Sequence, residues 1–388
     1  MKEKILILTP RLSDGGIEKV ASNLSMGLSG VEHKILALYG NEKKTYEFNT
    51  PPDVLNVKLR KGLAGKVFST IKRIIQVRKY VKNNNIDVLV SMGETCNLIS
   101  MLTGTSARKV LTIHSQLSIE AKTKGRYGKI QIALAKILYG RADSIIAVSK
   151  VVKDDVENEL NVKDVSVVYN GHDLDYIREK ANFDLPIIPN SDAIIVGRIT
   201  YAKGHWFLLR ALARVKEEYP DFILTVLGTI ENIDLYQKLT RIIKRLDLEK
   251  NVKFIDYTDN PYPYINSSKF LVQSSVYEGF PSVVIEALSL GVPVLTTNCG
   301  GATELITNGL TPSQLNDGMY VGKLGIISSH IGYEILDSEP LTTLEIEFSN
   351  SIIRMMKGGF DADELSAATN EFSLTKMANR YMDIINAK

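Results

Sequence analysis

The sequence predicts an α/β protein built from two doubly wound domains. Short runs of β-branched and other apolar residues alternate with helical patterns along the 388 residues. Each run is nearly continuous, which is typical of parallel strands that are buried on both faces. The pattern starts again after a polar stretch near the middle, and a chain of this length has room for two or three domains. We therefore expect two parallel sheets, each covered by helices.

The first domain is predicted over residues 1–172. Its strands are expected at Ile5–Leu8, Lys34–Leu38, Val88–Ser91, Val110–Ile113, Ser144–Val148 and Ser166–Val168. Its helices are expected near 17–29, 66–83, 95–103, 127–140 and 150–159. The alternation of strand and helix favours a parallel sheet with crossover helices.

A linker and a second domain follow. Residues 173–191 are polar and carry Pro186, Pro189 and Asn190, so we place the linker there. The second domain is predicted over 192–370, with strands at Ala193–Val196, Phe222–Leu227, Val252–Phe254, Phe270–Val272 and Pro293–Thr296. Its helices are expected near 204–218, 233–247, 281–290 and 341–357, and a closing segment, 371–388, holds a last helix near 374–386.

Composition excludes several classes of protein. The chain is 44% hydrophobic and 23% charged, which is ordinary for a soluble globular enzyme. We expect neither a membrane span nor a secretory signal, and therefore a cytoplasmic protein. Cys96 and Cys299 form no disulfide framework, and we expect both to be buried small hydrophobes. Residues 1–175 carry a net charge of +9 and the remainder −6, which suggests two domains with different partners.

Two glutamates bracket an apolar run in the segment Tyr277–Leu295. Pro281 suits the first turn of a helix, so Glu278 is expected in the preceding loop and Glu286 inside the helix. Backbone N–H groups at such a helix start bind anions, and carboxylates accept hydrogen bonds from the vicinal hydroxyls of a ribose or hexose. The alternative is a helix with solvated acids.

A second cluster follows the first strand of the second domain. Arg198 and Lys203 lie where a strand ends and a helix starts, which is the position for gripping a pyrophosphate. The alternative is a pair of surface cations on a loop. Together with the two glutamates, this cluster favours a site for a nucleoside diphosphate.

These residues resemble the motifs of the retaining, nucleotide-sugar-dependent glycosyltransferases of family 4 (glycosyl transferases group 1). The matching motifs, in chain order, are Gly15-Gly16-Ile17-Glu18, Ile113-His114-Ser115, Tyr169-Asn170-Gly171-His172-Asp173, Gly197-Arg198 with Lys203-Gly204, Glu278-Gly279-Phe280-Pro281 with Glu286, and Gly300-Gly301 with Glu304. Each motif is moderately specific, and six in order are strong. The resemblance implies the GT-B fold, in which two Rossmann-like domains face a central cleft and a C-terminal helix crosses back to the first domain.

The resemblance also implies residue roles. Arg198 and Lys203 would hold the donor pyrophosphate and stabilise the leaving diphosphate. Glu286 would bind the ribose, and Glu278 and His114 the transferred sugar. The expected catalytic residues are Glu278, His114, Arg198 and Lys203; the expected donor-binding residues are Gly15, Gly16, Arg198, Lys203, Glu278, Gly279, Phe280, Pro281, Ser282 and Glu286.

No metal or other cofactor is expected. The stretches Asp173-Leu-Asp175 and Asp361-Ala-Asp363 spell the Asp-x-Asp of metal-dependent glycosyltransferases, but neither follows a strand as that motif requires. Two cations and a helix dipole can supply the charge that a metal would bring. The G-x-G-x-x-G fingerprint is absent, which counts against an oxidoreductase.

The combined interpretation is a retaining hexosyltransferase that uses a nucleotide-diphosphate sugar, with UDP as the family-level choice. A sugar-nucleotide epimerase on the same fold would need acid and base groups around the sugar, and the first half offers few beyond Glu94 and His114. A non-catalytic sugar-nucleotide-binding protein is the third hypothesis, although the intact cluster of two glutamates and two cations argues against it.

Two basic stretches suggest the acceptor. Residues 54–86 contain no acid and nine cations, namely Lys58, Arg60, Lys61, Lys66, Lys72, Arg73, Arg78, Lys79 and Lys82; residues 121–142 contain six more cations and no acid. Apolar residues recur at helical spacing in the first stretch, which is typical of a helix on a membrane surface. Alternatively, the apolar stripe packs on the sheet and the cations are solvated. Nucleic acid is a weaker candidate, because interleaved aromatics and a binding module are lacking. We predict a cytoplasmic protein at the inner face of the cell membrane that glycosylates a lipid-linked saccharide or glycolipid for a surface polysaccharide.

Overall fold

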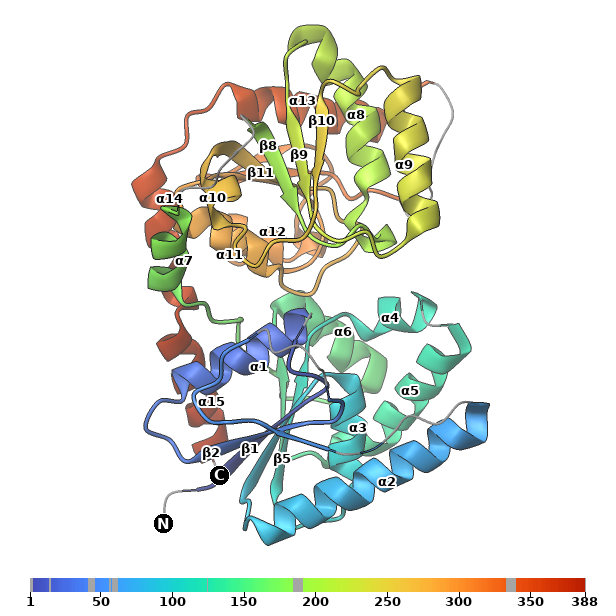
Figure 1. Cartoon of the computed structure of the whole chain (residues 1–388), viewed down its shortest axis with the longest axis vertical. Coiled ribbons are helices and arrows are strands. Elements are labelled where there is room, and N and C mark those ends of the chain that lie inside the picture. The colour runs from blue at the N-terminus through green and yellow to red at the C-terminus, as the bar shows by residue number, and fades with distance from the viewer. Residues whose placement is uncertain are drawn as a thin grey trace. The chain divides into compact units, whose positions relative to one another are not determined.

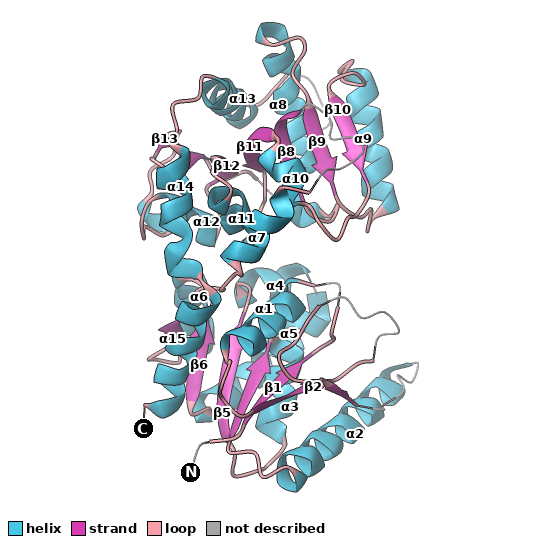
Figure 2. Ribbon diagram, turned by 60° about the vertical axis from the view of Figure 1, so that its left-hand side comes forward, coloured by secondary structure: helices cyan, strands magenta, loops and turns pink. Residues whose placement is uncertain are grey.

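The chain divides into two compact α/β units. The computed structural model describes residues 3–13, 15–40, 46–55, 57, 62–123, 125–183, 191–332 and 340–387. Unit 1 comprises Met1–His172 and Phe372–Lys388, and unit 2 comprises Asp173–Glu371 (Figure 1). Each unit is a sheet with helices on both faces (Figure 2).

Unit 1 contains a parallel sheet in the order β3-β2-β1-β4-β5-β6-β7. Its strands are β1 (Ile5–Thr9), β2 (His33–Ala37), β3 (Asp53–Val54), β4 (Val88–Met92), β5 (Arg108–Ile113), β6 (Ser144–Ala147) and β7 (Ser166–Val167). Every residue of β1 and β4 is buried. Because neither face of these strands meets water, their sequences are continuous apolar runs without alternation.

The helices of unit 1 cover the two faces of this sheet. They are α1 (Gly16–Gly27), α2 (Gly62–Asn83), α3 (Glu94–Leu102), α4 (Leu117–Thr123), α5 (Gly125–Leu138), α6 (Lys150–Leu160) and α15 (Leu374–Asn386). One core cluster joins α1 and α15 to β1, β2 and β4, and a second cluster joins α2 and α3 to alternate residues of β1 and β2. The period of two along each strand therefore divides its side chains between the two layers.

Unit 2 contains a second sheet in the order β10-β9-β8-β11-β12-β14-β13, in which only β13 is antiparallel to its neighbour. Its strands are β8 (Ser191–Val196), β9 (Leu224–Leu227), β10 (Val252–Ile255), β11 (Ser268–Gln273), β12 (Val294–Thr297), β13 (Tyr320–Val321) and β14 (Gly325–Ser328). Strands β8 and β11 are neighbours in the middle of the sheet, so the loops that follow them meet at one edge.

The helices of unit 2 are α7 (Leu174–Ala181), α8 (His205–Glu218), α9 (Ile233–Arg245), α10 (Tyr262–Asn266), α11 (Ser282–Ser289), α12 (Gly301–Ile306), α13 (Thr343–Met356) and α14 (Ala362–Ala368). Helices α8, α9 and α13 share one large core cluster with the sheet. A buried ion pair between Arg210 and Glu345 joins α8 to α13.

Every predicted strand and helix overlaps an element of the structure, and both cysteines are buried as predicted. The prediction omitted short elements, among them α4, α10, α12, β13 and β14. The last two of these join the sheet, where β14 pairs with β12 and β13 pairs with β14.

The stretch that we assigned to the linker differs from that prediction in its first part. Residues 174–181 form α7, which packs on α10 and α11 within unit 2. Asp173 caps this helix, because its side chain accepts a hydrogen bond from the N–H of Tyr176. Pro186, Pro189 and Asn190 lie outside the described residues.

The last helix, α15, packs on α1 in unit 1. The chain rejoins unit 1 beside the segment where it leaves, because the N–H of His172 donates to the carbonyl of Phe372 and the N–H of Leu374 donates to that of His172. Helix α15 then buries Met377, Ala378, Tyr381 and Ile385 in the core of unit 1.

We predict that Tyr381→Ala destabilises unit 1 alone. Tyr381 is fully buried, and truncating a buried aromatic side chain costs about 3–5 kcal/mol. Differential scanning calorimetry should show one transition moving to lower temperature while a second stays in place. Ile233→Ala, at an exposed residue of α9, is the matched control and should move neither transition.

Candidate functional site

The loops after β8 and β11 are locked together at the carboxyl edge of the unit 2 sheet. The N–H of Val276 donates to the carbonyl of Ala202, and the hydroxyl of Ser274 donates to the carbonyl of Lys203. Gly204 has a φ of +59°, and a Cβ there would lie 2.0 Å from the carbonyl oxygen of Ser274. Only glycine fits this contact, so the sequence Lys203-Gly204 fixes the start of α8 against the second loop.

Lys203 and Glu278 form an ion pair across these two loops. The Nζ of Lys203 lies 2.7 Å from Oε1 of Glu278, and the hydroxyl of Ser275 donates to the same oxygen over 2.9 Å. The two charged side chains are 20% and 17% exposed, so the pair is largely withdrawn from water but still reachable. Because both donors use Oε1, the other carboxylate oxygen, Oε2, is left to accept hydrogen bonds from a ligand.

The glycine pair after β12 supports the loop that carries Glu278. Gly300 has a φ of +64°, and a Cβ there would lie 2.1 Å from the carbonyl oxygen of Glu278. The N–H of Gly301 donates to the carbonyl of Gly279 over 3.0 Å, and the ring of Phe280 covers Gly301. The predicted donor segment therefore owes its position to a turn about twenty residues further along the chain.

A buried layer lies beneath the ion pair. The hydroxyl of Thr297 donates to the carbonyl of Ser275 over 2.6 Å and lies 3.3 Å from the Sγ of Cys299. Burial raises the pKa of the Cys299 thiol to about 12. Cys299 therefore stays a neutral thiol, and the layer holds Ser275 without adding a charge below Glu278.

Helix α11 begins at Ser282, directly after Pro281, where the sequence predicted it. Glu286 lies one turn inside the helix and is partly buried. Arg198 differs from Lys203, because its guanidinium is 61% exposed and pairs with Glu231 at 3.1 Å. The aliphatic part of Lys203 passes beside Gly197, where a Cβ would lie 3.1 Å from it.

Unit 1 carries the histidine of the predicted site at the end of β5. The hydroxyl of Thr112 donates to the carbonyl of Ser91, so its oxygen accepts the Nε2–H of His114, 2.8 Å away. Desolvation lowers the pKa of His114 to about 4. The imidazole is therefore neutral near pH 7, and its Nδ1 is an acceptor suited to a sugar hydroxyl.

The two predicted glycines of unit 1 differ in what surrounds them. Gly15 precedes α1, and a Cβ there would lie 2.0 Å from a carboxylate oxygen of Glu18, which folds back over the start of the helix. Gly16 has open space around it. A side chain at either position would cover the start of α1, either by displacing Glu18 or by filling that space.

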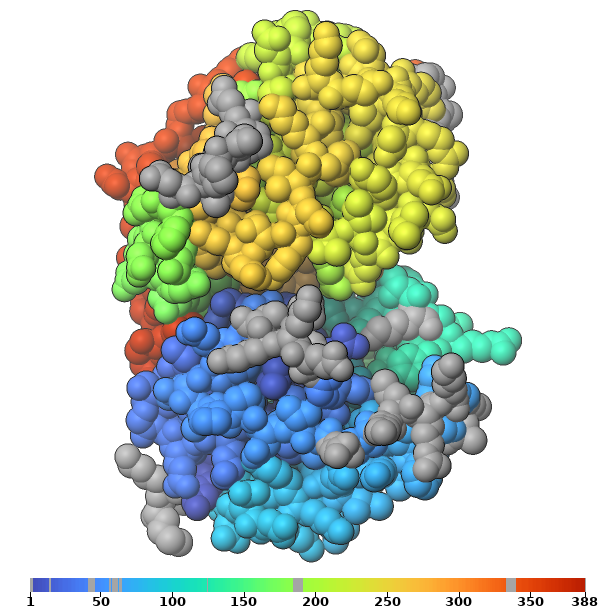
Figure 3. All heavy atoms as spheres, viewed as in Figure 1, coloured from blue at the N-terminus to red at the C-terminus, as the bar shows by residue number. Residues whose placement is uncertain are grey.

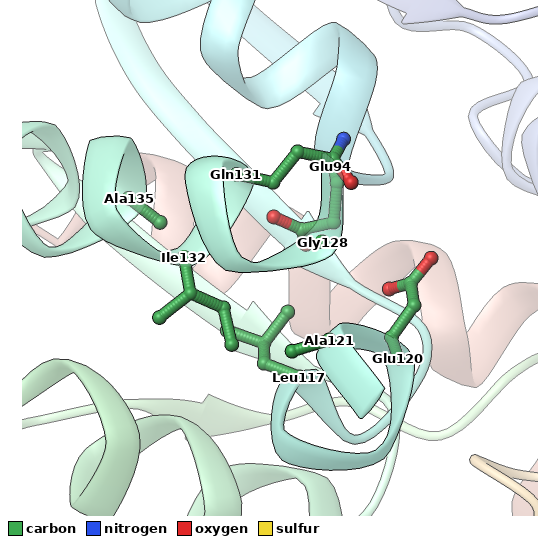
Figure 4. A pocket seen from close by; sticks show the side chains of 8 residues that line it. All are labelled: Glu94, Leu117, Glu120, Ala121, Gly128, Gln131, Ile132 and Ala135. Carbon is green, nitrogen blue, oxygen red and sulfur yellow. The ribbon is translucent and has the colours of Figure 1, made fainter. Parts of the chain in front are cut away.

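A small polar pocket lies in unit 1 between α3, α4 and α5 (Figure 4). Glu94 and Glu120 line it, but each already accepts a hydrogen bond: Glu94 from the hydroxyl of Tyr139 at 2.6 Å, and Glu120 from Ser115 at 3.0 Å. Glu94 and His114 were the few acid or base groups of the first half that an epimerase could use, and one carboxylate oxygen of Glu94 is engaged by Tyr139.

Gly15, Gly16 and His114 belong to unit 1, and the other predicted site residues belong to unit 2. Among these, Lys203 and Glu278 are in direct contact, and Gly279 and Phe280 are held beside them. Sequence reasoning missed Ser275, although its position three residues before Glu278 was the available signal.

Comparison with known proteins identifies the family. Residues 14–176 match the glycosyltransferase family 4 profile, and residues 179–315 match that of the glycosyl transferases group 1. A glycosyltransferase of Methanocaldococcus jannaschii is 31% identical over 312 residues, which cover 75% of this chain and 76% of that protein. The chain belongs to glycosyltransferase family 4, and it is a glycosyltransferase with the GT-B fold.

Two further comparisons concern substrates of other proteins. The N-acetylgalactosamine-N,N'-diacetylbacillosaminyl-diphospho-undecaprenol 4-alpha-N-acetylgalactosaminyltransferase of Campylobacter jejuni is 29% identical, over 78% of this chain and 83% of that protein. The crystal structure of HepE from Anabaena with UDP and glucose has a TM-score of 0.74, with 18% identity and full coverage of both chains. The second likeness concerns the fold.

Two further findings for the described residues concern membrane-spanning helices and metal sites. Each helix in the described ranges is too short or too polar to span a bilayer. Within the same ranges, no three His, Cys, Asp or Glu side chains are grouped so that they could hold a metal ion.

We predict that Gly300→Ala disturbs the site through the backbone. Its φ of +64° and ψ of −154° lie in a region that is nearly restricted to glycine, so alanine should cost about 1–3 kcal/mol and push Glu278 out of place. Thermal melting should show the loss. Gly332→Ala is the control, because Gly332 has open space around it and should tolerate the methyl group.

Proposed function

We propose that this glycosyltransferase moves a hexose from a nucleotide-diphosphate sugar, preferably a UDP-sugar, to a hydroxyl of a lipid-linked saccharide or glycolipid, with retention of the anomeric configuration. The observation that carries the proposal is the Lys203–Glu278 pair, in which one carboxylate oxygen is held by two donors, so that the other can accept hydrogen bonds from a sugar. The lipid-linked acceptor of the C. jejuni relative supports the acceptor class, and the UDP complex of HepE supports the nucleotide.

Each residue has a role in this reaction. Lys203 and Arg198 stabilise the negative charge on the leaving diphosphate, which supports a transfer without a metal ion. Glu278 accepts hydrogen bonds from hydroxyls of the donor sugar, and Glu286 from the ribose. His114 accepts a further sugar hydroxyl through Nδ1. The acceptor hydroxyl attacks on the face from which the diphosphate leaves, and a phosphate oxygen takes its proton.

Substitutions at the ion pair and at Ser275 test the separate roles of these residues. Glu278→Ala and Lys203→Ala should each lower turnover by orders of magnitude in a purified, folded enzyme. Ser275→Ala removes one of the two donors to Oε1, so turnover should fall about tenfold while the inhibition constant of free UDP stays unchanged, because Glu278 contacts the sugar and not the nucleotide. Lys203→Ala should weaken UDP itself.

Matched controls exist in the same unit. Ser349→Ala removes a buried serine hydroxyl on α13, and Lys216→Ala breaks a surface ion pair with Asp247. Neither should change turnover. Interconversion of nucleotide sugars without an acceptor would support an epimerase instead, and binding without turnover would support a sensor. Full activity of Glu278→Ala would refute the role of that residue.

The exposed surface of unit 1 supports a membrane-bound acceptor. On α2, Val67, Ile71 and Ile75 are about half exposed, while Val77 and Val81 pack in the core. On α5, four further apolar residues are exposed: Tyr127, Ile130, Leu134 and Ile137. Both helices lie at the surface of the unit (Figure 3, light blue and teal). The alternative, in which the apolar stripe packs on the sheet, therefore holds for Val77 and Val81 but not for Val67, Ile71 and Ile75.

One cation that was predicted to face the membrane does not do so. Arg73 is buried, so it cannot meet a lipid surface from that helix face. Lys66, Lys72, Arg78 and Lys79 are exposed. We propose that these cations and the exposed apolar side chains hold the protein on an anionic membrane.

We predict binding to anionic vesicles but not to neutral ones in sedimentation experiments, and weaker binding at high salt. Substituting Lys66, Lys72, Arg78 and Lys79 by glutamine should release the protein, as should serine at Val67, Ile71 and Ile75. The control removes the same charge from exposed residues of unit 2: Lys238, Arg241, Lys244 and Lys250. Equal recovery in the supernatant under all conditions would refute membrane association.

A further inference from the structure

A buried arginine in unit 1 is paired with no anion among the residues that the structure describes. Arg73 lies on α2 and is 2% exposed, and its Nε and Nη2 atoms have no hydrogen-bond partner. Ionised side chains are seldom buried without a partner, because the interior solvates them poorly. One turn further along α2, the amide oxygen of Gln76 is also buried without a donor.

The other buried arginine shows how this protein usually satisfies such a group. Arg210 is fully buried, and its Nε and Nη2 atoms bind the two oxygens of Glu345 at 2.5 and 3.2 Å. These two atoms form one edge of the guanidinium, which matches two oxygens of a carboxylate or phosphate. In Arg73 the same edge has no partner in the described chain.

The surroundings of Arg73 fix it at the carboxyl edge of the sheet. Its guanidinium lies 4.3 Å from the ring centroid of Tyr39. Tyr39 lies two residues after the end of β2, and its N–H donates to the carbonyl of Pro10. The guanidinium of Arg11, after β1, lies 6.0 Å from the same ring. Asp53 on β3, the strand beside β2, accepts the hydroxyl of Tyr80 at 2.5 Å. Two cations therefore share one aromatic ring, and the neighbouring carboxylate is already used.

We propose that Arg73, Arg11 and Tyr39 form a binding site for a phosphate group of the acceptor. The exposed Arg11 attracts the anion, and the fixed edge of Arg73 donates hydrogen bonds to two of its oxygens. Ligands of doubly wound sheets bind at the carboxyl ends of the strands, which is where these residues lie. The inference rests on the proposed function, because a lipid-linked saccharide carries a phosphate or diphosphate between sugar and lipid.

The test uses inorganic pyrophosphate as the probe, in the full-length chain with Lys203→Ala so that the donor site does not compete. Isothermal titration calorimetry should detect pyrophosphate binding, and Arg73→Gln should weaken it at least tenfold. Arg11→Gln should weaken it less, and it guards against a failure of Arg73→Gln to fold. Arg241→Gln, at an exposed arginine of unit 2, is the control and should change nothing. Equal pyrophosphate binding in all variants would overturn the proposal.

Kinetics then distinguish this inference from the proposed function. In the otherwise unmodified enzyme, Arg73→Gln should raise KM at least tenfold for a saccharide acceptor on a diphosphate-linked chain, and leave KM unchanged for the same saccharide on an alkyl chain. Arg73→Gln should leave the Kd of UDP unchanged, because the donor residues belong to unit 2. If the wild-type enzyme does not bind UDP, that result refutes the proposed function and leaves the phosphate site of unit 1 untouched. An arginine that only packs on Tyr39 would lower the melting temperature but leave both KM values unchanged.

The same variant also tests whether the bound phosphate belongs to the acceptor or to lipid headgroups of the membrane. If the site binds lipid headgroups, Arg73→Gln should reduce binding to anionic vesicles as well. We expect that binding to remain, because the exposed cations of α2 are intact in this variant. Loss of vesicle binding together with an unchanged KM for the diphosphate-linked acceptor would contradict the assignment to the acceptor.

Discussion

The ion pair between Lys203 and Glu278 depends on the packing of three loops. Lys203 follows β8, Glu278 follows β11, and the glycines that support Glu278 follow β12. These strands are neighbours in the sheet, so the three loops that follow their carboxyl ends lie side by side. Partly buried ion pairs lose solvation on folding, and further hydrogen bonds are needed to offset that loss. Ser275 supplies one such bond, and the rigid contacts at Gly204 and Gly300 keep the partners from drifting apart.

Much of this arrangement could be predicted from sequence, for reasons that are local. Continuous apolar runs such as Ile5–Thr9 identify strands that are buried on both faces, and Pro281 identifies the start of α11. Lys203 and Glu278 each follow a predicted strand of a parallel sheet, and the carboxyl ends of such strands lie at one edge. The short strands β13 and β14 were missed, because glycines and polar residues surround their few apolar residues in the sequence.

The remaining details depend on contacts between residues far apart in sequence. No local signal states that Ser275 and Lys203 share one oxygen of Glu278, since this follows from how two loops pack. The same holds for α2, whose spacing predicts an amphipathic helix but not which half of it leaves the sheet. Arg73 and Arg78 are equivalent in a count of charges, yet one is buried on Tyr39 and the other is exposed. Burial of a charge is a tertiary property.

Three features of unit 1 are unfavourable for its stability when nothing is bound to it. A buried arginine without an anion, a buried His172 whose ring nitrogens lack partners, and half-exposed apolar side chains on α2 each lower the stability of the free unit. Burial, reinforced by Lys19, lowers the pKa of His172 to about 4, so this group adds no charge near pH 7. A ligand or surface that satisfies such groups binds the folded unit in preference to the unfolded chain, and therefore stabilises it. Unit 2 also has buried groups without partners, such as His205 and Gln273, but the Nε and Nη2 edge of its buried Arg210 is paired with Glu345. Among the described residues, a buried guanidinium edge without an acid therefore occurs in unit 1, at Arg73, and the phosphate that we propose for this site would supply the missing anion.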